Sequence, residues 1–323
     1  MRIQLTSTAL YAPPRIQTAA ELAPLIGRSE EWIVSRTHVQ ERRVSDEGMD
    51  VMAAHAIRAA LGDSTPPDLL INASLTPLQL IPDSSVFIQK QLGWQELGIP
   101  SFSVHATCMS FMLGLHTAAT MIHSGAYRRV VVVSSEQGSV CRDFDHPESA
   151  ALIGDGAAAA VIEATPTDEP SALLAWRQTT WSDGADLAEL RGCGTRRHPN
   201  HSDTSPEDNL FRMRGPRIFK LAVQRVRDMA HLLLDDAGLT FDDIDLCVPH
   251  QASGPGLEAH SRFLDLPPDK VVNVVGQFGN CIAASIPMAL AHAEAEGRLK
   301  RGDHVLMLGT GAGLHVAGML LRW

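Results

Sequence analysis

The stretch 100–115, PSFSVHATCMSFMLGL, decides the fold that this sequence predicts, and Cys108 lies at its centre. Phe102 and Val104 are typical of a short buried strand. From Cys108 onward the apolar residues recur at helical spacing, at positions Met109, Met112, Leu113 and Leu115. We therefore expect a strand to pass into a helix at a cysteine.

A thiol in the first turn of a helix is expected to be more acidic than a free thiol. Unpaired N–H groups and the positive end of the helix dipole both favour the thiolate there. A decrease of about two units from the usual pKa of about 8.5, roughly 2.7 kcal/mol, would make thiolate the main form at neutral pH. Cys108 would then be a nucleophile, and the alternative is a small buried residue without chemistry.

Composition indicates a globular protein with one large or two ordinary domains. The chain has 323 residues, of which 45% are hydrophobic and 20% are charged. The net charge of −10 and the absence of a long basic run argue against nucleic acid or a membrane surface as the main partner. No apolar run is long enough to span a membrane and no leader pattern opens the sequence, so we expect a cytoplasmic protein.

Five cysteines are present, without a CxxC pair or zinc-ribbon spacing. This pattern favours neither a disulfide framework nor a structural metal site. Cys193, His198 and His201 stand in a polar stretch and have side chains that bind metals, but a solvated loop is the favoured interpretation. We expect no metal.

An internal repeat divides the chain into two similar halves. Three pairs of positions recur at offsets of 177, 172 or 173, and 175 residues: Asp68 with Asp245, Cys108 with Asn280 or Cys281, and Val130 with Val305. Each half alternates strands and helices, and KVVNVV at 270–275 is predicted as one of the strands. The sequence thus predicts an α/β fold built by duplication, with mainly parallel sheets and with domains at 1–168 and 169–323.

Three reactive side chains stand where a predicted strand ends or a predicted helix begins, the usual location of ligand sites in α/β folds. They are Cys108, His250 in VPHQAS, and Asn280 in GNCIAAS. A thiolate attacks a thioester carbonyl, while a neutral imidazole and a carboxamide both donate hydrogen bonds to an oxygen that becomes negative. Two such donors on an enolate oxygen favour decarboxylation of a malonyl group, and the resulting carbanion can attack the acylated cysteine.

The glycine-rich stretch GTGAGLHVAG at 309–318 supplies flexible backbone near the same site. The N–H groups of Ala312 and Cys108 are candidates for an oxyanion hole, in which each donor contributes roughly 3 kcal/mol. A purely structural turn is the alternative. The stretch lacks the pattern of a phosphate-binding loop.

These motifs together resemble β-ketoacyl-acyl-carrier-protein synthase III, one of the condensing enzymes with a thiolase fold. The resemblance rests on motifs spread over almost the whole chain: WIVSRT (32–37), ATCMSF (106–111), IGDGAAAAVIE (153–163), VPHQAS (248–253), GNCIAASIP (279–287) and the terminal glycine loop. It implies a thiolase-like fold whose two similar halves pack as α-β-α-β-α layers, with the cysteine in the first half and the histidine and asparagine in the second.

The resemblance also implies roles for residues and partners. Cys108 would accept the acyl group from acyl-CoA, and His250 and Asn280 would promote decarboxylation of a malonyl thioester. Trp32 and Arg36 would contact the coenzyme A nucleotide by stacking and by phosphate pairing. The family is normally a homodimer, works with an acyl carrier protein, and needs no cofactor or metal.

Some positions depart from the family pattern. His146, Pro147 and Glu148 stand where an arginine is usual, and 253–256 lack a basic residue proposed to dock the carrier protein. Ile81 replaces a common phenylalanine, which would widen the acyl pocket beyond acetyl.

The leading hypothesis is an acyltransferase that loads an acyl group on Cys108 and condenses it with a malonyl thioester. One alternative is transfer of the acyl group to a hydroxyl or amine without loss of carbon dioxide, with His250 as general base. The other is a non-catalytic partner protein with a thiolase fold.

Overall fold

The computed structural model describes all 323 residues, and most of its strands belong to two sheets. The first sheet has the order β1-β7-β6-β4-β5, with bounds Ile3–Tyr11, Asp155–Ala164, Arg129–Gln137, Leu69–Asn72 and Ser101–Ser103. The second has the order β11-β12-β13-β8, with bounds Leu246–Pro249, His304–Gly311, His315–Arg322 and Ala172–Thr180. Two short pairs complete the set, β2 (Ile16–Thr18) with β3 (Glu41–Arg43) and β9 (Ala188–Glu189) with β10 (Arg212–Met213).

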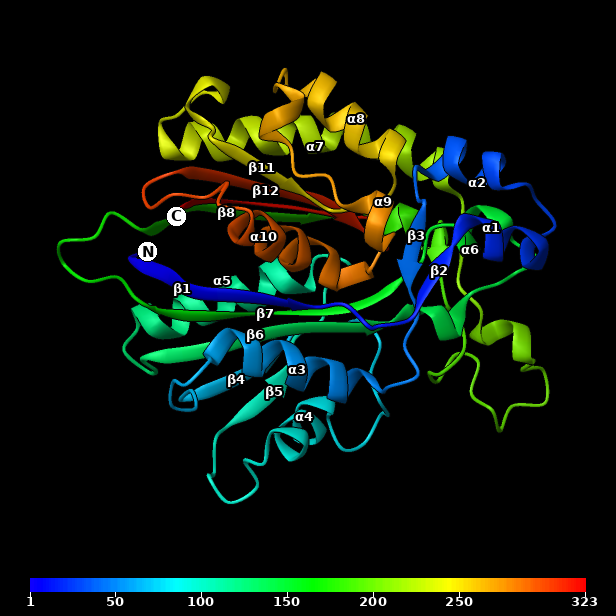
Figure 1. Cartoon of the computed structure of the whole chain (residues 1–323), viewed down its shortest axis with the longest axis horizontal. Helices are drawn as coiled ribbons and strands as arrows, with labels where there is room; N and C mark the ends of the chain where they lie inside the picture. Colours follow the sequence, from blue (N-terminus) through cyan, green and yellow to red (C-terminus); the bar gives the residue numbers. More distant parts are fainter.

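The helices form three layers around these sheets (Figure 1). Between the sheets lie α5 (Ser110–His123) and α10 (Ser285–Ala295). The first sheet is covered on its outer face by α3 (Met49–Leu61) and α4 (Ser84–Leu92), and the second by α7 (Gly215–Ala237) and α8 (Gly254–Phe263). The resulting order α-β-α-β-α is the thiolase-like arrangement that the family resemblance implies.

The remaining helices are short. Four lie at the end of the molecule where the strands of the two sheets approach each other, namely α1 (Ala19–Leu22), α2 (Glu30–Thr37), α6 (Pro147–Ala150) and α9 (Val275–Phe278). Single 3-10 turns are η1 (Ala23–Ile26), η2 (Gly138–Cys141), η3 (Ser182–Gly184), η4 (Pro206–Asn209), η5 (Phe241–Asp243), η6 (Pro268–Lys270) and η7 (Ile282–Ala284). None of the helices combines the length and apolar character that crossing a membrane requires.

The apolar run of β6 shows how the sequence produces these layers. Val130 and Val132 point into the central core around α5 and α10, whereas Val131 and Val133 point into the core beneath α3. All four side chains are fully buried. Since successive side chains of a strand face opposite sides, a strand covered on both sides must be apolar throughout.

The sheets are mixed, and the expectation of mainly parallel sheets is wrong. Parallel pairing joins β4 to β5 and to β6, and β11 to β12. However, β7 pairs antiparallel with β1 and β6, and β13 pairs antiparallel with β8 and β12. The chain returns from β6 to β7 in the first half, and from β12 to β13 in the second. Neither connection contains a crossover helix of the kind that parallel neighbours need.

The segment 270–275 is not a strand, which corrects a second expectation. Val271 forms only an isolated bridge with Cys247, and α9 begins at Val275. The Gln251 side chain takes up the neighbouring backbone groups, accepting from Val274 N at 2.9 Å and donating to Val272 O at 3.1 Å. The Gln251 side chain thus makes the hydrogen bonds with this segment that a neighbouring strand would otherwise make.

The two halves repeat the same strand register. Leu69 of β4 lies opposite Val130 of β6, and Leu246 of β11 lies opposite Val305 of β12. An aspartate precedes the first strand of each pair and caps the second strand. Asp245 Oδ2 accepts a hydrogen bond from His304 N at 2.8 Å. In the first half, Asp68 Oδ2 accepts the equivalent bond from Arg129 N. The duplication read from the offsets is therefore present in three dimensions.

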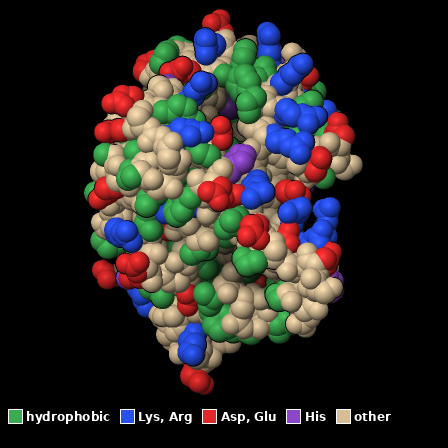
Figure 2. All heavy atoms as spheres, turned by 90° about the vertical axis from the view of Figure 1, so that its right-hand side faces the viewer, with side chains coloured by type: hydrophobic (Ala, Val, Ile, Leu, Met, Phe, Trp, Pro, Cys, Tyr) green, Lys and Arg blue, Asp and Glu red, His purple; other side chains and the backbone are tan.

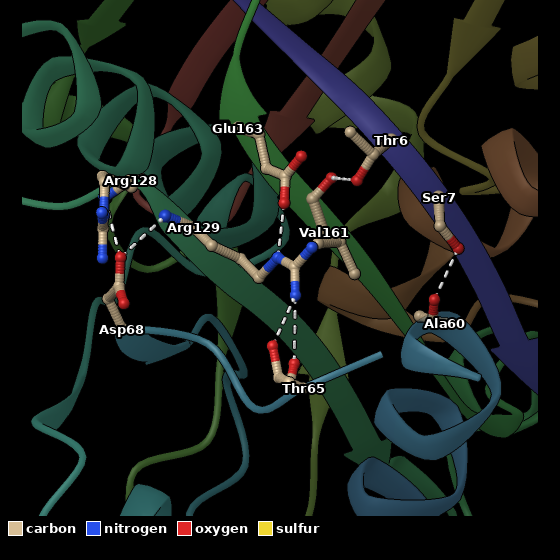
Figure 3. A network of polar contacts seen from close by, with 9 residues as sticks. All are labelled: Thr6, Ser7, Ala60, Thr65, Asp68, Arg128, Arg129, Val161 and Glu163. Atoms are coloured by element: carbon tan, nitrogen blue, oxygen red, sulfur yellow. Dashed lines mark hydrogen bonds and ion pairs between the residues drawn. The ribbon is translucent and has the colours of Figure 1, made fainter. Parts of the chain in front are cut away.

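The network around Asp68 fixes the start of β6 (Figure 3). Asp68 Oδ2 accepts hydrogen bonds from the backbone N–H groups of Arg128 at 2.9 Å and Arg129 at 3.1 Å. The Arg129 guanidinium pairs with Glu163 of β7 and donates to Thr65 Oγ1 at 3.1 Å. The two backbone hydrogen bonds from Arg128 and Arg129 lower the pKa of Asp68, because they favour its charged form.

We predict that Asp68→Ala lowers the free energy of unfolding by about 1 kcal/mol, since two backbone donors lose their charged acceptor. Because the folded-state pKa of Asp68 is lowered, this contribution is complete above its ordinary pKa of 3.8 and disappears as the pH falls through the folded-state value. Urea denaturation at neutral and decreasing pH measures the difference. Asp63→Ala, in the same loop, serves as the control, and an equal loss in that variant would contradict the prediction.

Candidate active site

Cys108, His250 and Asn280 line one cavity of about 600 Å³. The structure thus brings together the three side chains that the sequence places at separate strand and helix ends. The wall is predominantly apolar and includes the loop 75–80, the β12–β13 turn, and parts of α7 and α8.

A tight elbow holds Cys108 two residues before α5 begins at Ser110. Thr107 adopts a left-handed conformation with φ of 51°, which is unfavourable for a residue with a branched side chain. Ser110 Oγ fixes the elbow by donating to Thr107 O at 2.6 Å and accepting from Ala106 N at 3.0 Å. The surrounding hydrogen bonds thus hold a strained backbone in place.

The β12–β13 turn lies directly against this elbow. A Cβ atom on Gly311 would lie 2.2 Å from Thr107 Oγ1 and 3.3 Å from Cys108 N, so only glycine allows this approach. Thr107 Oγ1 also donates to Ala312 O at 3.3 Å. The contact places the Ala312 N–H beside the cysteine sulfur, where it and the Cys108 N–H both favour the thiolate.

The thiol of Cys108 is nevertheless not acidic, which corrects the sequence-based expectation. Burial and the charge of Glu136 raise its pKa to about 12, against the opposing effect of the two N–H groups. Removal from water outweighs the helix terminus because a charged sulfur loses its hydration in the apolar cavity. In the free protein Cys108 is therefore protonated at neutral pH.

His250 follows β11 and is held by backbone and packing. Its backbone N–H donates to Leu308 O at 2.8 Å. Gly309 leaves room for the His250 side chain, since a Cβ atom at Gly309 would lie 2.7 Å from His250 Cβ. Burial, together with the nearby His260, lowers the pKa of His250 to about 4, so the ring is neutral at neutral pH.

The surroundings of His250 assign its tautomer. Nδ1 is enclosed and has no hydrogen-bond partner. Because an unpaired buried N–H is rarer than an unpaired acceptor, we place the proton on Nε2, the ring nitrogen on the cavity side. The neutral ring then presents a hydrogen-bond donor to the cavity.

Asn280 precedes η7 and α10, and its orientation is set by its neighbours. Its backbone N–H donates to Leu152 O at 2.8 Å, and its Oδ1 accepts from Ile282 N at 2.9 Å. Its Nδ2 lies 3.5 Å from Ala252 O, a long hydrogen bond that uses one of two protons. The amide thus also offers an N–H donor to the cavity.

Glu136, at the end of β6, is a buried group of the site that the sequence analysis did not identify. Its carboxylate accepts hydrogen bonds from Thr76 N at 3.0 Å and Thr76 Oγ1 at 2.7 Å, and so holds the cavity loop 75–80. Burial raises its pKa to about 7 despite these bonds. The signal in the sequence that points to such a residue is a glutamate that follows VVVV and two serines in the buried strand RVVVVSSEQ.

Other predicted residues lie outside the cavity wall. Trp32 and Arg36 are on α2, where the Arg28 guanidinium lies 5.4 Å from the Trp32 ring centroid. Figure 2 shows the face that carries α2, with Lys and Arg side chains gathered in its upper part around a hollow. Ile81 is 85% exposed and does not line the cavity, although Leu78 and Leu80 do.

The polar stretch around residue 200 contains no metal-binding group. Cys193 Sγ lies 3.3 Å from Asn209 Oδ1, and the rings of His198 and His201 are 6.0 Å apart. No group of three or more metal-binding side chains forms here or elsewhere.

Comparison with known proteins gives concordant results. The family model described as 3-oxoacyl-(acyl-carrier-protein) synthase III matches residues 102–181, and its C-terminal model matches residues 234–323. A β-ketoacyl-(acyl-carrier-protein) synthase III from Laribacter hongkongensis is 36% identical over 99% of both chains.

Solved structures agree in fold. The 3-oxoacyl-(acyl-carrier-protein) synthase III from Aquifex aeolicus is similar with a TM-score of 0.89 and 32% identity, over 99% of this chain and 100% of that one. The priming β-ketosynthase of the R1128 polyketide pathway has a TM-score of 0.89 and 29% identity, over 99% of this chain and 95% of that one.

The high pKa of Cys108 leads to a prediction about its reactivity. At pH 7.5 iodoacetamide should label Cys108 at least about ten-fold more slowly than the exposed Cys193, because the thiolate is the reacting form. Glu136→Gln should accelerate labelling of Cys108, because removing the negative charge lowers its pKa. Peptide mass spectrometry over time measures both rates, with the remote Glu169→Gln as control; faster labelling of Cys108 than of Cys193 would refute the prediction.

Proposed function

The chain belongs to the 3-oxoacyl-(acyl-carrier-protein) synthase III family, and from this premise we propose that it condenses an acyl-CoA with a malonyl thioester. The observation that supports this most directly is the meeting of Cys108, His250 and Asn280 in one apolar cavity. The carrier protein in the names of its relatives makes malonyl-acyl-carrier protein the proposed acceptor.

The first step of the proposal transfers the acyl group to Cys108. The sulfur bonds to the thioester carbonyl, the bond to the coenzyme A sulfur breaks, and the thiol proton leaves with free coenzyme A. The carbonyl oxygen becomes negative on the way. The N–H groups of Cys108 and Ala312 lie beside the sulfur and are the proposed donors to this oxygen, with roughly 3 kcal/mol from each.

The second step forms the carbon–carbon bond. The malonyl carboxylate leaves as carbon dioxide, and the negative charge moves to the thioester oxygen. His250 Nε2–H and the Asn280 amide are the proposed donors to that oxygen. The carbanion then attacks the acyl carbonyl, the bond to the Cys108 sulfur breaks, and the sulfur takes a proton to restore the thiol.

The neutral state of His250 supports this assignment. Its pKa of about 4 leaves the ring uncharged at neutral pH, so it donates a hydrogen bond without adding a positive charge that would hold the malonyl carboxylate. In this proposal the reaction uses only side chains and backbone N–H groups, with neither cofactor nor metal.

We extend the proposal to the coenzyme A nucleotide and to assembly. Trp32 and Arg36 on α2 are the proposed contacts for the adenine ring and the phosphates. A homodimer is proposed because exposed apolar side chains gather on one segment, at Leu78, Leu80, Ile81 and Val86. Exposed apolar side chains that lie together mark surfaces that bind another protein.

Two substitutions separate the two steps. His250→Ala and Asn280→Ala should lower malonyl-dependent carbon dioxide release by about 100-fold or more, because each removes a donor to the enolate oxygen. Both variants should still acquire an acyl adduct on Cys108. Intact mass spectrometry measures the adduct, with Cys108→Ala as the unreactive control. Undiminished carbon dioxide release in both variants would contradict the assigned roles.

The nucleotide contacts are tested by comparing two donors. Trp32→Ala should raise the KM for acyl-CoA by about ten-fold, because the adenine ring loses its stacking partner. The KM for the matching acyl-pantetheine, which has no nucleotide, should stay unchanged. Ser35→Ala on the same helix is the control, and an equal effect on both donors would show that Trp32 does not contact the nucleotide.

A further inference from the structure

The cavity continues beyond the three proposed catalytic side chains into the space between α7 and α8. We call this part the α7–α8 chamber and define it by six lining residues, Ala222, Val223 and Val226 of α7 and Gly256, Ala259 and Phe263 of α8. Along each helix these residues are three or four positions apart or adjacent, so they occupy one side of the helix. Two apolar helix sides therefore face a common space.

This space is not filled by side chains of the chain itself. A Cβ atom on Gly256 would have only one neighbour within 4 Å, Ser253 Oγ at 3.2 Å. The rings of Phe219 and Phe263, 6.5 Å apart and both partly exposed, border the chamber on its solvent side. Because protein interiors are normally close-packed, an open apolar seam between two helices indicates a ligand.

The lining selects an alkyl chain over other parts of the substrate. His260 is the polar side chain of the α8 wall, and burial lowers its pKa, so it is neutral at neutral pH. Its Nδ1–H donates to Gly256 O at 2.7 Å, and its Nε2, buried without a hydrogen-bond partner, is a single acceptor, too few for the two amides of a pantetheine arm. The amide groups of a pantetheine arm would lose their hydrogen bonds to water in such surroundings, whereas methylene groups gain by burial.

The dimensions suit a chain of intermediate length. From Gly256 to Phe263 the lined side of α8 extends for about 10 Å, given a rise of about 1.5 Å per residue. The chamber is continuous with the space around Cys108 and His250.

We propose that the α7–α8 chamber binds the alkyl part of a medium-chain acyl group, such as decanoyl, of the thioester that acylates Cys108. Gly256 admits the chain, because any larger side chain there would project into the open space next to it. This inference rests on the proposed function and names the class of acyl donor.

Gly256→Ile tests the chamber by filling its entrance. The backbone φ of Gly256 lies outside the left-handed region, so the helix accepts a side chain. Acylation of Cys108 by decanoyl-CoA, followed by intact mass, should slow by at least about ten-fold, whereas acylation by acetyl-CoA should stay within about two-fold. Arg262→Leu, which adds an apolar side chain to an exposed position of the same helix, should change neither rate.

A binding measurement separates this inference from the proposed function. In the Cys108→Ala background, calorimetry with free decanoic acid should show binding that Gly256→Ile weakens by about ten-fold or more and Arg262→Leu leaves unchanged.

The possible outcomes are distinct. Equal slowing of acetyl and decanoyl transfer by Gly256→Ile overturns the chamber, because the space would then carry the thioester arm. Failure of every acyl-CoA to modify Cys108 refutes the proposed function, and the chamber is then supported if decanoic acid binding depends on Gly256. The chamber is overturned if decanoic acid does not bind, or if Gly256→Ile leaves its affinity unchanged.

Discussion

The contact between the β12–β13 turn and the cysteine elbow is the constraint on which the site depends. Gly311 lies so close to Thr107 and Cys108 that any side chain would collide with them. Cys108 belongs to the first half of the chain and Ala312 to the second, so the donors at the sulfur come from both. The two central helices and the duplicated sheets hold these halves in the relative position that this contact requires.

Burial then determines the charge state of the centre. It moves each ionisable group toward its neutral form, with a pKa of about 12 for Cys108, about 7 for Glu136 and about 4 for His250. Before the substrate arrives, Cys108 and His250 are therefore uncharged at neutral pH, and Glu136 is only partly ionised. Charge appears on substrate oxygens during the reaction, where N–H donors in a medium of low polarity stabilise it strongly.

The layers were implied by the resemblance to the synthase III family, whereas local patterns predicted the duplication and placed Cys108, His250 and Asn280 at strand and helix ends. These features depend on periodicity and on positions relative to strand ends. The acidity of Cys108 was predicted wrongly, because the helix terminus is visible in the sequence and the depth of burial is not. The segment 270–275 was taken for a strand because the hydrogen bonds of Gln251 are a property of the folded chain. Glu136 carries a signal in its buried strand, but its contact with the 75–80 loop exists only in the folded chain. The chamber was missed because it requires knowing that α7 and α8 face each other.

The origin of the two proposed oxyanion donors in different halves has a consequence for synthesis at the ribosome. Cys108 emerges early, whereas Ala312 lies in the turn between the last two strands of the chain, which end at Arg322. Until that hairpin has formed, Cys108 lacks the Ala312 N–H, one of the two proposed donors to the acyl oxygen. Acylation of Cys108 is therefore expected to require that the two halves of the chain have folded against each other.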